Sequence, residues 1–276
     1  MIAISQAERR KLQLTQLRIA AEVADLCDAH EINYALLAGS ALGARRHQGF
    51  IPWDDDMDIG MVRDEYERFL AVAKSELSTD LYVQDWRDDP HMGAPFTKVR
   101  LSGTRMIEES SKDTGGHKGI FIDIFPLDNV PDSPAEYVWR LQLEFWKRLL
   151  RHKCGYSIRK QRGLRRIGDL LLGAISPLVA GPFAKRRLHS LMTKFRSRES
   201  KRVVAVGGSY AFTKETLKKE WITNLVPMPF EDKSFRCFCA IDEYLQHLYG
   251  DFMECPPVEQ RYNKHPILEL AFSGDS

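Results

Sequence analysis

An acidic cluster around residue 55 is the part of the sequence whose residue types and spacing best suit chemistry. Four aspartates occupy positions 54, 55, 56 and 58, and an apolar run follows, which predicts a strand over 56–61. Alternate residues of a strand project from one face, so Asp56 and Asp58 are expected to lie together. Two adjacent carboxylates repel each other, and a divalent cation relieves that repulsion. Oxygen ligation of this kind suits Mg2+ or Mn2+, which also bind substrate phosphates.

Two other segments are expected to complete the site. Asp123 lies in the apolar run 119–125, a predicted strand. An isolated carboxylate in such a run is costly unless something pairs with it, so Asp123 is the candidate third ligand. Gly39 and Ser40 end a predicted buried strand, 34–38, and a glycine before a small hydroxyl residue lets the backbone approach a phosphate. Together these residues predict a nucleotide phosphate bridged by a metal ion rather than a solvated acidic turn.

Hydrophobic periodicity and breaker residues predict the elements that position these side chains. A helix capped by Asp64, with Glu67 as its capping-box partner, is expected to run to about Leu77. The strand over 119–125 is expected to end at Pro126. Further helices are predicted over 5–30, 41–46, 134–153 and 234–249, and further strands over 81–84, 96–101 and 203–206. The fold class is therefore α+β, a mixed sheet with flanking helices.

Charge is almost balanced along the chain as a whole, with 40 Lys and Arg residues against 38 Asp and Glu residues and a formal net charge of +2. This balance gives no sign of a nucleic-acid partner. The basic residues are nevertheless concentrated between positions 147 and 202, where Asp169 and Glu199 are the acids. We interpret the chain as a catalytic core over 1–134, a basic helical insertion over 135–202, and a C-terminal part over 203–276 that completes the catalytic domain.

An apolar stretch within the insertion, 170–183, suggests two interpretations. It is shorter than the roughly 20 residues that a membrane span needs, and Pro177 interrupts it. Basic residues flank it on both sides, and this arrangement suits docking at an anionic membrane surface through 164–187. The other interpretation is a helical hairpin packed on the catalytic core, with its cations merely solvated.

The cysteines and the N-terminal residues bear on the compartment. Five cysteines are scattered along the chain, and their spacing fits neither a disulfide framework nor a zinc site. Reduced thiols are therefore expected. Residues 1–11 lack the apolar stretch of a signal peptide, so the predicted location is cytoplasmic, with peripheral contact at the inner face of the membrane as the further hypothesis.

Several segments together resemble the LicD family. Residues 38–60 resemble the long signature of that family, and 121–127 resemble its second block. Residues 98–100, together with 249–253 and Pro256-Pro257, also fit, whereas the basic insertion does not. The resemblance implies a nucleotidyltransferase-like fold. Bacterial members of the family transfer phosphocholine to cell-surface glycans, lipopolysaccharide or teichoic acid precursors, and the animal relatives fukutin and fukutin-related protein transfer ribitol phosphate from a CDP donor.

The resemblance also implies roles for individual residues. Asp56 and Asp58 match the metal-binding pair of the family, Asp123 matches the third carboxylate, and Asp54 matches a further acid. Gly39 and Ser40 match the phosphate-binding turn. The candidates for donor phosphate contacts outside this turn are His47, Lys98 and Arg100. The alternative for Lys98 and Arg100 is that both are exposed charges on an edge strand. The alternative for His47 is a structural loop histidine. His265 is a weaker candidate than any of these.

The expected function is Mg2+-dependent (or Mn2+-dependent) transfer of a phospho-alcohol group to a hydroxyl of a glycan acceptor, free or lipid-linked. CDP-choline is the leading donor, CMP is the leaving group, and either Asp54 or Asp123 takes the hydroxyl proton. A quaternary ammonium suits an aromatic wall, for which Trp53, Trp86 and Phe125 are candidates unless they belong to the core. The alternatives are a nucleotidyltransferase that releases pyrophosphate from an NTP, and a non-catalytic binding protein on a decayed fold.

Overall fold

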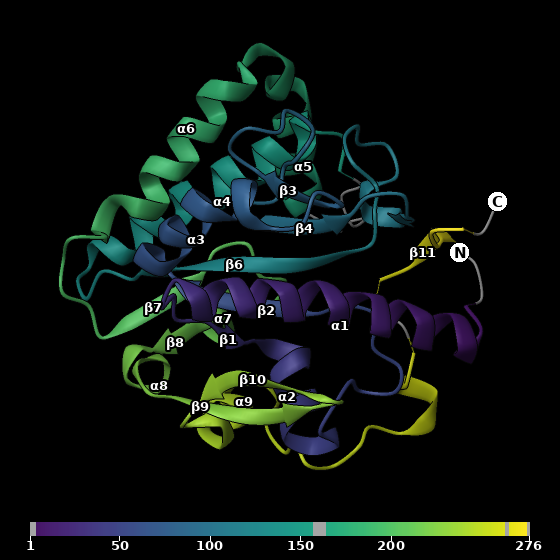
Figure 1. Ribbon diagram of the computed structural model, residues 1–276. Helices are drawn as coiled ribbons and strands as arrows, with labels where there is room; N and C mark the ends of the chain where they lie inside the picture. The colour runs from purple at the N-terminus through teal and green to yellow at the C-terminus, as the bar shows by residue number, and fades with distance from the viewer. Residues whose placement is uncertain (1–3, 157–163, 263–264, 275–276) are drawn as a thin grey trace.

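A seven-stranded mixed sheet forms the centre of the computed structural model, which describes residues 4–156, 164–262 and 265–274 (Figure 1). Five strands lie in the order β1 (Ala35–Leu36), β2 (Asp58–Val62), β6 (Phe121–Asn129), β4 (Thr97–Leu101) and β3 (Leu81–Asp85). β7 (Arg202–Ala205) pairs with the end of β6, and β8 (Thr216–Lys218) pairs with β7. β2 and β6 run parallel, and the other pairs of this sheet run antiparallel. The predicted α+β class with a mixed sheet is confirmed.

Helices cover this sheet and connect its strands. α1 (Gln6–Ala29) lies along the sheet in Figure 1 and begins at a capping box formed by Ser5 and Glu8. α2 (Ala38–His47) follows β1, α3 (Arg63–Glu76) follows β2, and α9 (Ile241–Tyr249) packs on α2. The short helices are α7 (Phe212–Glu215), α8 (Lys219–Thr223), η1 (Glu109–Ser111) and η4 (Val258–Gln260).

Two antiparallel pairs of strands lie outside the main sheet. β9 (Leu225–Phe230) and β10 (Lys233–Phe238) form a hairpin near α2 and α9 in the lower part of Figure 1. β5 (Arg105–Glu108) pairs with β11 (Ile267–Ala271), so the C-terminal segment returns to the first half of the chain. The predicted helix over 234–249 is wrong in its first part, because Phe235 and Cys237 are buried on one side of β10 with the alternation of a strand.

Two other boundary predictions are wrong for identifiable reasons. β6 does not end at Pro126 but continues to Asn129. Pairing with β4 stops at Ile124 and pairing with β7 starts at Leu127, so only β2 flanks the proline and its missing N–H removes no bond to β4 or β7. α3 has no side-chain cap: Asp64 pairs instead with Arg196 at 2.5 Å.

The helical insertion lies on one side of the sheet, at the top of Figure 1. It contains α4 (Ala135–Lys153), α5 (Leu164–Ile175), η2 (Ser176–Leu178), α6 (Gly181–Met192) and η3 (Thr193–Phe195). The chain leaves the sheet after β6 and returns at β7, where the N–H of Val130 donates to the carbonyl of Arg202 at 3.0 Å. Lys185 is buried and donates to the carbonyls of Trp86 and Asp89. This contact ties α6 to the loop after β3, so Lys185 is not a solvated cation.

Two findings bear on the remaining sequence predictions. No helix in the described ranges is long and apolar enough to cross a membrane. All five cysteines are free thiols, as predicted, and Cys27 and Cys237 are buried.

Candidate active site

Asp58 and Asp123 lie side by side at the start of two parallel strands. They are register partners in the pairing of β2 with β6, so adjacent strands place their Cα atoms about 5 Å apart. The N–H of Asp123 donates to the carbonyl of Met57 at 2.9 Å, and the N–H of Asp58 donates to the Ser40 hydroxyl at 2.8 Å. The structure therefore brings together two of the three predicted metal ligands and one half of the predicted phosphate-binding turn.

Two buried glutamines of α1 hold the acidic loop that precedes β2. Gln13 Nε2 donates to the carbonyl of Asp54 at 3.0 Å, and Gln16 Nε2 donates to the carbonyl of Asp55 at 2.8 Å. A Cβ atom on Gly39 would lie 2.7 Å from Asp54 Oδ2, so the absence of a side chain at Gly39 lets the Asp54 carboxylate approach the start of α2. The glutamines therefore position the loop through its backbone carbonyls.

Asp58 and Asp123 resist ionisation. Burial raises the pKa of Asp58 well above its usual value, and the charges of Asp56, Asp123 and Asp54 raise it further. Burial also raises the pKa of Asp123 to about 6, although the neighbouring Lys98 ammonium opposes the shift. Carboxylates that repel each other in a desolvated site are relieved by a cation, and an all-oxygen donor set fits Mg2+ or Mn2+.

Lys98 and Arg100 lie on an internal strand, not on an edge strand. β4 runs between β6 and β3, and both side chains are buried. Lys98 Nζ forms an ion pair of 2.7 Å with Asp123 Oδ1. Arg100 donates to Gln84 Oε1 at 2.5 Å and to the carbonyl of Gly119 at 2.8 Å. Lys98 is therefore part of the carboxylate site, whereas the guanidinium of Arg100 is committed to neighbouring strands and loops.

Gly39 and Ser40 lie in the first turn of α2, which begins three residues earlier than predicted, at Ala38. No side chain caps this helix, and the N–H of Ala38 donates to Tyr244 Oη at 2.8 Å. Uncapped amides at a helix N-terminus attract anions such as phosphate. His47 ends the same helix, about 13 Å away along the axis at 1.5 Å per residue, so it does not join this turn.

His265, a weak candidate from the sequence, contacts both Asp56 and Asp55, and Asp55 was not among the predicted site residues. His265 Nδ1 lies 3.3 Å from Asp56 Oδ2 and 3.5 Å from Asp55 Oδ1. Contact with Asp55 raises the pKa of His265 to about 10, and the charge of Asp56 adds to the shift. Within the described ranges these three residues are the group whose ligand atoms all lie within 4.8 Å of one another; Asp56, Asp58 and Asp123 do not come that close together.

Comparison with known proteins assigns the chain to a family. Residues 31–152 match the family model described as LicD/FKTN/FKRP, nucleotidyltransferase domain. The chain is 30% identical over 261 residues to the lipopolysaccharide cholinephosphotransferase LicD of Haemophilus influenzae, a match that covers 93% of this chain and 95% of that protein. The chain belongs to the LicD family. An uncharacterized protein of Rickettsia typhi is 40% identical over 66 residues, which are 24% of this chain and 21% of that protein.

The aromatic candidates for a wall beside a quaternary ammonium differ in where the structure places them. Trp86 is fully buried, and Phe125 packs against Phe96 with 4.5 Å between ring centroids, so both belong to the core. Trp53 lies under the guanidinium of Arg261 at 5.3 Å. Tyr210 and Tyr249 join their hydroxyl groups at 3.2 Å, and their rings meet edge to face. Burial raises the pKa of Tyr249, and the Asp54 charge contributes to the shift, which places this pair within electrostatic range of the acidic loop.

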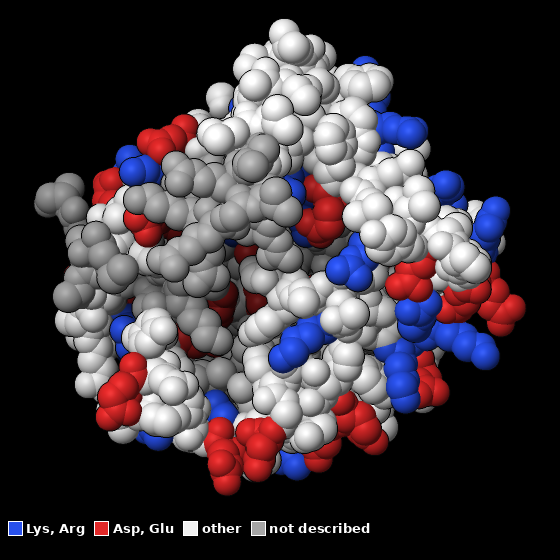
Figure 2. All heavy atoms as spheres, turned by 180° about the vertical axis from the view of Figure 1, so that it is seen from behind, with Lys and Arg blue, Asp and Glu red and all other residues white. Residues whose placement is uncertain are grey.

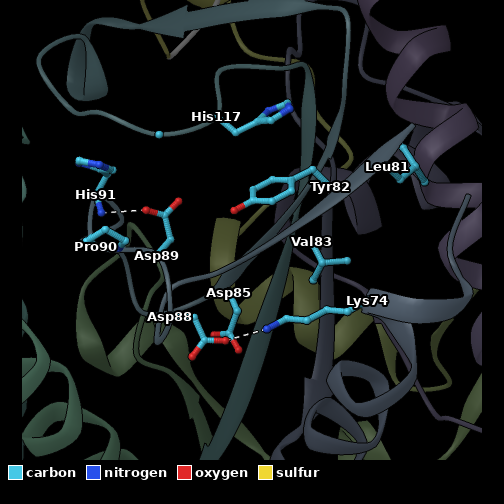
Figure 3. Close-up of a pocket in the computed structure, with 11 residues that line it drawn as sticks. Lys74, Leu81, Tyr82, Val83, Asp85, Asp88, Asp89, Pro90, His91 and His117 are labelled. Carbon is cyan, nitrogen blue, oxygen red and sulfur yellow. Dashed lines mark hydrogen bonds and ion pairs between the residues drawn. The ribbon is translucent and has the colours of Figure 1, made fainter. Parts of the chain in front are cut away.

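A pocket of about 560 Å3 lies at the edge strand β3 and contains none of the predicted site residues. Figure 3 shows Tyr82 stacked near His117 on one side of it, with 4.9 Å between ring centroids, and Asp88 paired with Lys74 at 2.7 Å on the other. Asp89 accepts hydrogen bonds from Gln84 and from the backbone of His91, so its carboxylate is already satisfied. Acidic side chains also lie in a hollow near the middle of the molecule in Figure 2. The family's motifs lie at the carboxylate site of β2 and β6, not in the β3 pocket.

Proposed function

We propose that this LicD-family protein is a transferase that moves phosphocholine from CDP-choline to a hydroxyl of lipopolysaccharide or a related cell-surface glycan, free or lipid-linked. The similarity to the Haemophilus influenzae cholinephosphotransferase over nearly the full length of both chains supports the group transferred and the acceptor class. The main structural support for this chemistry is that Asp58 and Asp123 are register partners beside the uncapped start of α2. It puts cation ligands next to backbone amides that suit a phosphate.

The reaction follows from what these residues can hold. The amides at the start of α2 bind a donor phosphate, and Ser40 fixes the backbone of Asp58 against them. A Mg2+ or Mn2+ ion bound by Asp56, Asp58 and Asp123 would neutralise charge on the donor phosphates. The acceptor oxygen forms a bond to the phosphorus that carries choline, the bond from that phosphorus to CMP breaks, and CMP leaves with the electron pair. Positioning and electrostatics supply most of the rate gain.

Asp54 is the general base in this proposal. The acceptor hydroxyl must give up a proton as it attacks, and the two candidates were Asp54 and Asp123. Asp123 is buried, lies beside Asp58 and forms an ion pair with Lys98, which suits a ligand. The Asp54 carboxylate lies against Gly39 at the start of α2, where the donor phosphate is expected. Geometry within reach of the proton decides between candidate bases.

Product analysis tests this function. The purified protein is incubated with CDP-choline, lipopolysaccharide and Mg2+, and CMP and phosphocholine-modified glycan are measured. We expect both products in equal amounts, and their loss in EDTA and in Asp58→Asn. Release of pyrophosphate from an NTP, without CMP from CDP-choline or any other CDP-alcohol, would instead establish the nucleotidyltransferase alternative.

We further propose that the insertion holds the enzyme at an anionic membrane surface, near a lipid-linked acceptor. Large apolar side chains of α5, η2 and α6 point outward, with Leu178 84% and Leu170 67% exposed. We call this set the apolar tip: Leu170, Leu171, Ile175, Leu178 and Phe183. In Figure 2 the top of the molecule, formed by the α5–α6 connection, is mostly uncharged, and basic side chains lie along its flank. Arg186 and Arg187 are exposed on α6 and suit anionic headgroups, whereas Lys185 is buried and takes no part.

A further inference from the structure

Asp55 is a buried carboxylate held in a long ion pair with His265. Its side chain is 2% exposed, and among the described residues neither of its oxygens accepts a hydrogen bond. The nitrogen of His265 lies 3.5 Å from Oδ1, beyond the usual length of a charge-assisted hydrogen bond. Buried polar atoms almost always have a hydrogen-bond partner, and a buried carboxylate that lacks one is costly even beside a cation. The environment of Asp55 therefore points to a ligand that satisfies these oxygens.

The surroundings of Asp55 have the composition and spacing of a cation site. One nitrogen and two carboxylate oxygens, from Asp55, Asp56 and His265, lie within 4.8 Å of one another. The two distances from His265 Nδ1 are 3.3 Å and 3.5 Å. Ligands bound tetrahedrally at about 2.1 Å are about 3.4 Å apart, so these two distances fit a small cation without rearrangement. A site with an imidazole nitrogen favours a transition-metal cation over Mg2+.

We propose that Asp55, Asp56 and His265 bind a divalent transition-metal cation, such as Zn2+ or Mn2+, at a second site next to the all-oxygen site of Asp58 and Asp123. The cation takes the place of the proton on His265 Nδ1, and that proton leaves to solvent as the metal–nitrogen bond forms. Asp56 has two carboxylate oxygens, so it can serve both sites. The second site is an addition to the ligand set of the proposed function and does not depend on which donor or acceptor is used.

The second site would join two distant parts of the chain. Asp55 and Asp56 belong to the loop before β2, whereas His265 precedes β11, which pairs with β5. In the structure, the imidazole ring of His265 contacts both carboxylates and so links the two segments. A bound cation would replace this contact with metal–ligand bonds and fix the C-terminal segment beside the acidic loop. His265 is a metal ligand in this proposal and has no role in proton transfer.

Pulsed electron paramagnetic resonance with Mn2+ alone tests the second site, because a bound imidazole nitrogen couples magnetically to the ion whereas oxygen ligands do not. We expect nitrogen-coupled Mn2+ in the wild type, even with excess Mg2+ to compete at the all-oxygen site. His265→Gln should abolish the coupling and weaken Mn2+ binding by at least tenfold. Asp55→Asn should weaken the same binding. His247→Gln, which changes an exposed histidine on α9, is the matched control and should leave the coupling intact.

The outcomes separate this proposal from the proposed function. Nitrogen coupling that is absent in the wild type, or that persists in His265→Gln, overturns the second site and leaves His265 as an ion-pair partner of Asp55 and Asp56. Asp123→Asn should retain the nitrogen-coupled ion while it loses CMP release. Failure of the proposed function would appear separately, as absence of CMP release from CDP-choline in a wild type that still binds the nitrogen-coupled ion. Circular dichroism on each variant confirms that the fold is retained.

Discussion

The hydroxyl oxygen of Ser40 accepts a hydrogen bond of 2.8 Å from the backbone N–H of Asp58. This bond joins the first turn of α2, which suits a phosphate, to the first residue of β2, which carries a candidate cation ligand. We predict that Ser40→Ala lowers turnover about 10- to 100-fold, because small errors in position are costly in catalysis. Steady-state kinetics with CDP-choline measure this effect.

A hydroxyl exposed on a helix provides the control for this prediction. Ser75 donates to the carbonyl of Val72 on α3, far from the site in sequence, and Ser75→Ala should leave turnover unchanged. Equal turnover in Ser40→Ala and the wild type would show that Ser40 does not position Asp58 for catalysis.

Removal of Asp58 or Asp123 should change stability in opposite directions while abolishing activity in both cases. Asp58→Asn relieves carboxylate repulsion in a buried site, so metal-free protein should become more stable by about 1 kcal/mol. Asp123→Asn leaves the buried Lys98 ammonium without its 2.7 Å partner, which should cost about 3–5 kcal/mol. Urea unfolding in EDTA at pH 7 gives both values.

A double variant checks the reason for the second effect. Asp123→Asn combined with Lys98→Met removes both charges, and it should recover most of the lost stability without restoring CMP release. If the double variant is less stable than Asp123→Asn alone, Lys98 contributes something other than a charge to be paired.

The contrast between Asp58 and Lys98 shows what the sequence could predict. The strands that carry Asp58 and Asp123 follow from local apolar runs, and family resemblance predicted that both residues are ligands. The position of β4 between β6 and β3 depends on pairing between distant segments, so the sequence left Lys98 as either a phosphate clamp or an exposed edge charge. Once β4 is internal, the Asp123 carboxylate already has a partner before any cation binds.

His265 and the hairpin of β9 with β10 show the same limit. His265 reaches Asp56 because β11 pairs with β5, and no local pattern encodes that pairing. The error over 234–249 has a local cause: no glycine or proline separates the apolar residues of β10 from those of α9, so their combined spacing imitates a helix. The alternating burial of Phe235 and Cys237 is that of a strand, and the segment forms a strand because it pairs with β9.

Tyr210 and Tyr249 should determine preference for a quaternary ammonium. Tyrosine rings near acidic residues attract such groups through their negative faces. We predict that Tyr210→Leu raises the KM for CDP-choline about five- to tenfold, with a smaller effect on CDP-ethanolamine. Kinetics with both donors measure the change in preference, and a parallel rise in both KM values would contradict a role in ammonium recognition.

Glu67 should stabilise the fold near neutral pH but not in acid. Burial would raise the pKa of Glu67, but contacts with His189, Arg87 and Arg63 outweigh it and lower the pKa to about 2. A lowered pKa contributes stability above the unfolded value of 4.5 that is lost as the pH falls toward 2. Glu67→Gln should therefore be less stable than the wild type at pH 7, by on the order of 1 kcal/mol.

Urea unfolding of both proteins between pH 7 and pH 3 checks the sign of the Glu67 effect. The difference should be constant down to about pH 5 and shrink below it. A difference that grows in acid would mean that Glu67 is not held ionised by its basic neighbours.

The apolar tip should be required for binding to anionic vesicles. We expect the wild type to co-sediment with phosphatidylglycerol-containing liposomes at low salt, and Leu170→Ser combined with Leu171→Ser to weaken binding at least tenfold. Arg186→Gln with Arg187→Gln should weaken binding and reduce its salt dependence. Val258→Ser, which changes an exposed apolar residue outside the insertion, is the control. Wild type that stays in the supernatant would show that the tip is a solvent-facing helical hairpin.

The hydrogen bond between Val130 and Arg202 makes the whole insertion, in topological terms, the loop of a β-hairpin. β6 and β7 would remain adjacent antiparallel strands with a tight turn in place of α4, α5 and α6. A different segment joined at these two residues should therefore leave the register of Asp58 and Asp123 unchanged. In the proposed function, phosphate transfer depends on Asp58 and Asp123 whereas membrane docking depends on the insertion, so chimeras joined at residues 130 and 202 should redirect the enzyme to a different acceptor surface without loss of the chemistry.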